Sequence, residues 1–80
     1  MKLPRDVSGR GLAKALARLE YTIDHQTGSH IRLTTTQCGT HQVTVPAHDP
    51  LKIGTLLAIL RDVEAHHGLT RHEVLHELFE

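Results

Sequence analysis

The stretch of residues 21–46 most constrains the fold, because it holds three short runs of alternating residues joined by turns of only a few residues. In the first run, Tyr21, Ile23 and His25 alternate with polar residues. A parallel pairing needs a crossover of a dozen or more residues, which these turns cannot supply. The sequence therefore predicts a three-stranded antiparallel sheet in which each strand pairs with the next. The predicted strands cover residues 21–26, 29–36 and 41–45.

The second predicted strand has one apolar and one polar face. Because side chains alternate along a strand, Ile31, Leu33 and Thr35 share one face. The other face then carries His30 and Arg32. We expect the first face to be core and the second to be available to water or a partner.

Two runs with helical periodicity flank the predicted strands. In residues 9–19, three leucines recur at four and seven residues, and Ser8 can cap the start of a helix. In residues 53–67, five aliphatic residues follow helical spacing until Gly68 ends the run. Both helices should cover the same face of the sheet.

A third, short helix is predicted over about residues 70–79. The segment TRHE is a capping box, in which the Thr70 hydroxyl caps the helix and Glu73 reaches back to the Thr70 backbone N–H. A chain of 80 residues supports one modest core, because it buries only roughly 60–65% of the surface that its unfolded form exposes. We expect an α+β fold in one domain over residues 1–80, with its core at about 8–67.

Charge and cysteine content limit the function classes. Residues 1–52 carry seven basic and four acidic residues, and residues 53–80 carry two basic and five acidic residues. Electrostatic attraction for nucleic acid therefore belongs to the first half, and it is weak. Cys38 is the only cysteine, which excludes an internal disulfide and a cysteine-built zinc site.

The sequence also bears on membranes and targeting. It has no run of eighteen apolar residues that could span a bilayer. The first residues, MKLPRDVSGRG, lack the apolar run of a signal peptide. We therefore expect a cytoplasmic protein that does not associate with membranes.

The stretch HEVLH, residues 72–76, matches the H-E-x-x-H pattern of zinc peptidases. The pattern supplies two of the three protein ligands that such a site needs, and Glu73 already has a structural role in the capping box. We interpret His72 and His76 as exposed helix surface.

Other histidines allow further interpretations. His25, His30 and His41 lie on neighbouring predicted strands, so a three-histidine metal site depends on the register of the sheet. His66 and His67 end the second helix, where a protonated imidazole interacts favourably with the helix dipole. We predict no bound metal or other cofactor, because polar strand faces often carry histidines that bind no metal. For His66 and His67 we favour the structural role at the helix end.

Three segments together resemble the HicA family of toxins, the RNA-cleaving half of bacterial and archaeal toxin–antitoxin pairs. They are SGRGLAKALARLEY (8–21), GSHIRLTT (28–35) and VPAHDPLKIGTLLAIL (45–60). The likeness covers nearly all of the chain and departs at Glu20, where relatives often have glycine. It implies a fold like the double-stranded-RNA-binding domain, with α-β-β-β-α order and both helices on one sheet face. It also implies metal-independent cleavage of messenger RNA and a hetero-oligomeric complex with a HicB-like antitoxin.

The essential histidine of the family maps onto His30. RNA carries its own nucleophile, the 2′-hydroxyl, so an enzyme can cleave it by moving protons and stabilising charge on phosphorus. A histidine with the ordinary pKa of about 6.5 is present as both acid and base near neutrality. A positioned acid or base of this kind accelerates a reaction by roughly 10² to 10⁴-fold.

Five further residues are predicted to support His30. Gly28 lets the backbone come close to the substrate, and the Ser29 hydroxyl can bind a phosphate oxygen. Arg32 and Lys52 can hold flanking phosphates, the latter together with the N-terminus of the second helix. His48 is either a second acid or a residue that orients its loop.

Two other function classes stay open. One is a non-catalytic RNA-binding module of the same fold, although such domains hold phosphates with several lysines at the second helix and this chain offers only Lys52 there. The other is a zinc-dependent hydrolase that uses HEVLH or the strand histidines. RNA cleavage in the presence of a chelator separates all three classes.

Overall fold

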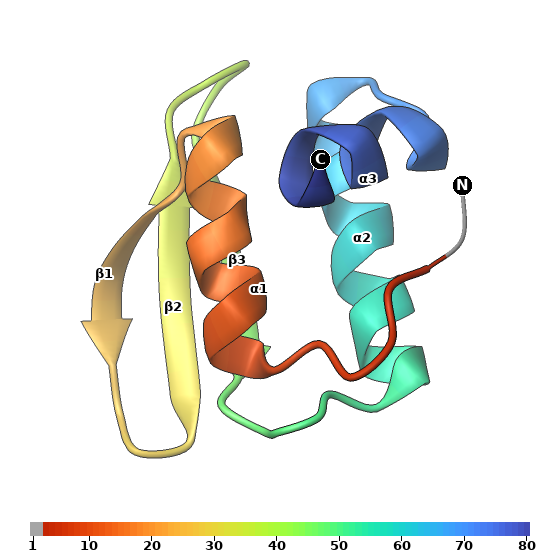
Figure 1. The fold of residues 1–80 in the computed structure, drawn as a ribbon. Helices are drawn as coiled ribbons and strands as arrows, with labels where there is room; N and C mark the ends of the chain where they lie inside the picture. Colours follow the sequence, from red (N-terminus) through yellow and green to blue (C-terminus); the bar gives the residue numbers. More distant parts are fainter. Residues whose placement is uncertain (1–2) are drawn as a thin grey trace.

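The computed structural model describes residues 3–80 as three helices against one sheet (Figure 1). Met1 and Lys2, which begin the predicted domain, lie outside the described residues. The order of elements confirms the predicted α+β fold, α-β-β-β-α with a further C-terminal helix. The elements are α1 (Gly9–Leu16), η1 (Ala17–Leu19), β1 (Thr22–Gln26), β2 (His30–Thr35), β3 (His41–Pro46), α2 (Ile53–His67) and α3 (Arg71–Phe79).

The sheet has the predicted meander topology, with strand order β1-β2-β3 and both pairings antiparallel. In the pairing of β2 with β3, His30 lies opposite Pro46 and Thr35 lies opposite His41. The pairing of β1 with β2 is irregular, because the register shifts between Ile23 and His25. β1 is thus a bulged edge strand, and β2 is the central strand.

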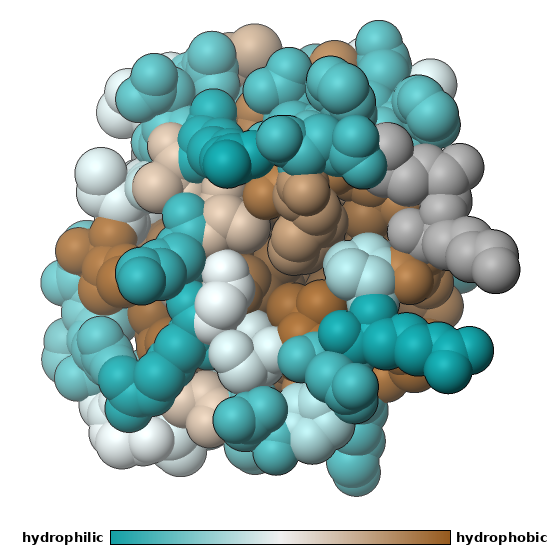
Figure 2. Space-filling view, viewed as in Figure 1, coloured by the Kyte–Doolittle hydropathy of each residue, from teal (hydrophilic) through white to brown (hydrophobic). Residues whose placement is uncertain are grey.

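The helices cover one face of the sheet, as predicted. Ile31, Leu33 and Thr35 of β2 point into the core and are each at most 1% exposed, whereas His30 and Arg32 are exposed. The buried Thr35 hydroxyl donates to the Leu19 carbonyl oxygen at 3.3 Å, so its polar group is satisfied. Seen from the helical side, hydrophobic side chains lie between α1 and the α2–α3 pair, within a hydrophilic rim (Figure 2).

The start of α1 is the predicted one, and its end differs slightly. Ser8 caps it, because its hydroxyl oxygen accepts from the Gly11 N–H at 2.9 Å. The regular helix stops at Leu16, and the remaining predicted turn is the 3₁₀ helix η1. Glu20 then adopts the left-handed conformation, with φ 66°, which glycine takes most readily. Glutamate therefore supports the same chain reversal that glycine would.

α2 follows its predicted bounds, but its first residue does not join the core. Helical spacing places Ile53 with Leu56 and Leu60, yet Ile53 is 55% exposed. It is the first residue of the helix, and the buried residues of α2 begin at Leu56, about one turn later. None of the helices in residues 3–80 is both long and apolar enough to cross a membrane.

Candidate active site on the open face of the sheet

Polar side chains from all three strands occupy the face of the sheet that no helix covers. His30 and Arg32 are neighbours on this face of β2, as the alternation predicted. Arg32 pairs with His25 of β1 on one side and with Thr44 of β3 on the other. Residues that are directly opposite point to the same side of a sheet, so these side chains share the open face.

His30 is held at the first position of β2, directly after the β1–β2 turn. Its backbone N–H donates to the Thr27 hydroxyl at 3.1 Å, and the Thr27 N–H donates to the His30 carbonyl oxygen at 2.9 Å. The Ser29 hydroxyl lies 3.0 Å from the His30 Nδ1 atom. Among residues 3–80 the other ring nitrogen, Nε2, has no hydrogen-bond partner. The turn therefore fixes the histidine and leaves one of its ring nitrogens for a substrate.

The connection between β3 and α2 meets this turn. The Ala47 N–H donates to the Ser29 carbonyl oxygen at 2.9 Å, next to His30. His48 is exposed, and its carbonyl oxygen accepts from the Gly9 N–H at 2.8 Å. The β1–β2 turn, this connection and the N-termini of α1 and α2 all lie at one end of the molecule (Figure 1).

Lys52 lies farther along the same connection, as the residue that precedes α2. It is exposed, and its side chain makes no capping hydrogen bond to the helix. The first turn of α2 carries no acidic residue either. The backbone N–H groups of that turn therefore have no side-chain partner, which is the condition for binding an anion at a helix N-terminus.

Gly28 is not required by the fold. Its φ is not positive, and a Cβ at this position would meet no atom within 4 Å. We expect Gly28→Ala to leave the unfolding midpoint unchanged within the ordinary range of surface substitutions, about 0.5 kcal/mol. Substrate binding in this open space would be hindered by the added methyl group. A lower unfolding midpoint, measured in denaturant, would instead assign Gly28 a structural role.

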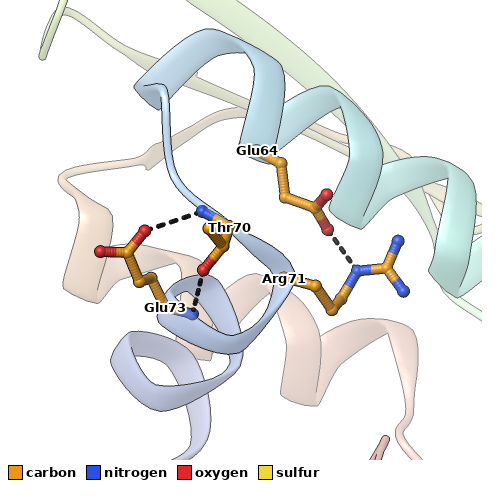
Figure 3. Close-up of polar contacts among 4 residues, drawn as sticks. All are labelled: Glu64, Thr70, Arg71 and Glu73. Carbon is orange, nitrogen blue, oxygen red and sulfur yellow. Dashed lines mark hydrogen bonds and ion pairs between the residues drawn. The ribbon is translucent and has the colours of Figure 1, made fainter.

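The HEVLH segment is an ordinary capped helix start in the structure (Figure 3). The Thr70 N–H donates to Glu73 Oε1 at 2.9 Å, and the Glu73 N–H donates to the Thr70 hydroxyl at 3.1 Å. The Thr70 backbone hydrogen bond lowers the pKa of the Glu73 carboxyl group. Arg71 forms an ion pair with Glu64, which holds the start of α3 against α2. The predicted capping box is confirmed, and Glu73 is engaged as a cap.

A three-histidine metal site on the strands is excluded by the register. His30 is the first residue of β2. His41, on β3, lies opposite Thr35, the last residue of β2, so the two histidines are at opposite ends of this strand pair. His41 instead lies beside Tyr21, with its Nδ1 atom 2.8 Å from the phenol oxygen. Residues 3–80 contain no group of three histidine, cysteine or acidic side chains that could hold a metal ion. His72 and His76 belong to no such group, and they are exposed on α3 as predicted.

A histidine–tyrosine cluster that we did not predict lies at the other end of the molecule. The buried Tyr21 hydroxyl lies 2.8 Å from His41 Nδ1 and 3.1 Å from His67 Nε2. His66 stacks on His41 with ring centroids 4.3 Å apart, and its Nε2 donates to the Gln37 and Gly39 carbonyl oxygens at 2.9 and 3.0 Å. The structural role of His66 and His67 at the end of α2 is thus broader than an interaction with the helix dipole. His66 joins the C-terminus of α2 to the β2–β3 loop, and His67 joins it to Tyr21.

This cluster makes stability depend on pH. Burial lowers the pKa of the His41 and His67 imidazoles, and repulsion from His66 adds to the effect. Burial and the Asp62 charge raise the pKa of Tyr21 to about 12, so the phenol stays neutral. Below the ordinary histidine pKa of about 6.5 the folded chain then binds fewer protons than the unfolded chain. The contribution of these histidines to the free energy of unfolding is therefore complete above that pH, and it decreases as the pH is lowered through it.

We expect the unfolding midpoint to fall between about pH 7.5 and about pH 5.5. In the double variant His41→Gln/His67→Gln, which keeps polar groups near Tyr21, this dependence should weaken. His72→Gln/His76→Gln is the matched control, because it removes two exposed histidines and should retain the dependence. Equal pH dependence in both double variants, measured by denaturant unfolding, would contradict the assignment to the cluster.

Comparison with known proteins agrees with this arrangement of elements. Residues 9–65 match a family model described as the HicA toxin of bacterial toxin–antitoxin systems. The match includes α1, the whole sheet and most of α2, and leaves α3 outside. No curated protein and no solved structure matched in the corresponding searches. Because the matched residues make up more than half of the chain, it belongs to the HicA family of toxins of bacterial toxin–antitoxin systems.

Proposed function

We propose that the chain is an endoribonuclease that cleaves messenger RNA without a metal, with His30 as its general acid/base. The observation that carries the proposal is the position of His30. It lies exposed on the uncovered sheet face, and the Ser29 hydroxyl at 3.0 Å engages one ring nitrogen while the other has no partner in residues 3–80. Family membership supports a toxic activity in general, and this histidine is the group that best fits RNA chemistry.

The reaction needs few protein groups. His30, in its neutral form, takes the proton of a ribose 2′-hydroxyl, and the resulting oxygen attacks the adjacent phosphorus atom. The bond from phosphorus to the 5′-oxygen breaks, which leaves a 2′,3′-cyclic phosphate and a 5′-hydroxyl. The Ser29 hydroxyl restrains the imidazole in one orientation. Aligning it with the substrate then contributes less to the activation free energy.

Cations near His30 can hold the substrate phosphates. The Arg32 guanidinium follows His30 on the same face, and it has no ion-pair or hydrogen-bond partner within residues 3–80. A guanidinium binds a phosphate with two parallel hydrogen bonds. Lys52 and the uncapped N-terminus of α2 offer a second anion-binding position at the same end of the molecule. These positions suit phosphates that flank the scissile bond.

A toxin of this family acts with an antitoxin partner. We propose that the partner is a HicB-like protein that covers the open sheet face. The side chains of that face, His30 and Arg32 among them, are exposed in the free chain. A partner seated on them would exclude RNA without altering the fold.

Incubation of the purified chain with RNA in EDTA tests the proposal. New RNA ends in the presence of the chelator are the expected result. RNA that is bound but remains intact would favour the non-catalytic RNA-binding module. Cleavage that EDTA abolishes and zinc restores would favour the zinc-dependent hydrolase.

A further inference from the structure

The bulge in β1 changes the face on which His25 lies. Ile23 pairs with Leu33, and the next paired residue, His25, lies opposite Arg32. Asp24 is therefore the extra residue of a β-bulge. With strict alternation, His25 would lie on the helix-covered face together with Ile23. The bulge instead turns His25 to the face that carries Arg32.

Neighbouring side chains agree with this orientation. Ile23 and Gln26 line a groove against α1, on the helix-covered side of β1. On the open side, Asp24 Oδ2 accepts from the Thr34 hydroxyl at 2.5 Å. His25 is exposed, and within residues 3–80 its side chain has no hydrogen-bond or ion-pair partner. The open face thus holds a second uncommitted imidazole.

We infer that His25 is the general acid of the site, an assignment that rests on the proposed function of His30 as the base. When the 2′-oxygen attacks phosphorus, the 5′-oxygen on the opposite side leaves with a negative charge. Protonated His25 donates its proton to that oxygen as the bond from phosphorus breaks. The proton from the 2′-hydroxyl stays on His30, so each turnover exchanges the protonation states of the two histidines.

The register places His25 and His30 at diagonal positions of one strand pair. His25 lies directly opposite Arg32, and His30 is two residues from Arg32 along β2. Residues at such positions are about 7–8 Å apart along the backbone. Two side chains on one face at this spacing can approach one phosphodiester from two sides, each imidazole about 3 Å from an oxygen. The Arg32 guanidinium, on the same face, is placed to bind a non-bridging oxygen.

His48 is the other candidate for the acid, but it does not lie on a strand of the sheet. It lies beyond the end of β3, in the connection toward α2. Its carbonyl oxygen accepts from the N–H of Gly9, the first residue of α1, on the helix-covered side of the sheet. The register therefore favours His25 over His48 as the acid.

Two RNA substrates test the assignment. The first is an oligoribonucleotide whose cut site has been mapped with the wild-type chain, and the second has sulphur in place of the 5′-oxygen at that site. A thiolate leaves without protonation, so the second substrate does not need a general acid. We expect His25→Ala and His25→Gln to cleave the first substrate roughly 10²-fold or more slowly and the second at nearly the wild-type rate. His30→Ala should be slow on both, and the control His72→Gln/His76→Gln, which removes two exposed histidines of α3, should resemble the wild type.

The pH–rate profile gives a second readout that a merely structural role would not alter. The wild type should show a bell-shaped profile, and the His25 variants should lose its alkaline limb, which reports deprotonation of the acid. Wild-type rates in both His25 variants, or equal slowing on both substrates, would overturn the inference while leaving the proposed function intact. A wild-type chain that cuts no RNA, so that no cut site can be mapped, would overturn the proposed function itself.

Discussion

The variant His30→Ala is expected to lose RNA cleavage by about 10² to 10⁴-fold and to keep its fold. The loss follows from removing the group that we propose moves the proton of the 2′-hydroxyl. The fold should persist because the His30 side chain is exposed, and within residues 3–80 its only hydrogen bond is to the neighbouring Ser29 hydroxyl. Single-turnover cleavage rates and the unfolding midpoint measure the two effects separately.

The double variant His72→Gln/His76→Gln is the control for His30→Ala. It removes the two histidines of the zinc-peptidase pattern, which lie exposed on α3. Cleavage should be unchanged, because α3 packs against α1 and α2 rather than beside the open sheet face, and Glu73 serves as a cap. Wild-type cleavage by His30→Ala, or its loss in the α3 double variant, would contradict the proposed site.

The variant Gly9→Ala is expected to destabilise the chain by about 3 kcal/mol. A Cβ on Gly9 would clash with the backbone carbonyl of Pro46, at the end of β3. Backbone cannot move aside as a side-chain tip can, and the Gly9 N–H also donates to the His48 carbonyl oxygen at 2.8 Å. For a chain of this size, such a loss lowers the thermal midpoint by roughly 12–24 °C.

Gly54→Ala is the matched control for Gly9→Ala. Both glycines lie in the first turn of a helix, but a Cβ at Gly54 would meet no atom within 4 Å. Alanine there should raise stability by about 0.5–1 kcal/mol, because it restricts the unfolded chain and favours the helix. Similar midpoints for the two variants would show that the approach of α1 to Pro46 is not tight.

Much of the fold could be predicted from local patterns. The alternation of Ile31, Leu33 and Thr35 specified the buried face of β2, and all three are in the core. The capping box at Thr70 and Glu73 fixed the start of α3. These features depend on neighbours in the sequence, which is why the sequence alone revealed them.

Features that depend on register could not be predicted in the same way. The bulge at Asp24 moves His25 to the face of Arg32, and no residue in the first strand marks that irregularity. Tyr21 gave a partial signal, because a buried phenol needs a hydrogen-bond partner. Its partners, His41 and His67, are brought to it by the β2–β3 pairing and by the packing of α2.

The position of His30 in the proposed site followed from a local motif, whereas its surroundings came from the structure. Alternation placed His30 and Arg32 on one face of a strand, and family resemblance singled out the histidine. The contact of Ala47 with Ser29 joins a turn to a connection eighteen residues later. Only the fold shows that these two segments meet.

Cleavage of an RNA with a single 2′-deoxyribose at the mapped cut site, in the presence of EDTA, tests the central claim most directly. The unmodified RNA should be cut to a 2′,3′-cyclic phosphate and a 5′-hydroxyl, and the deoxy-substituted RNA should stay intact at that position. Cleavage of the substituted RNA, or ends that carry a 5′-phosphate and appear only with added metal, would contradict it.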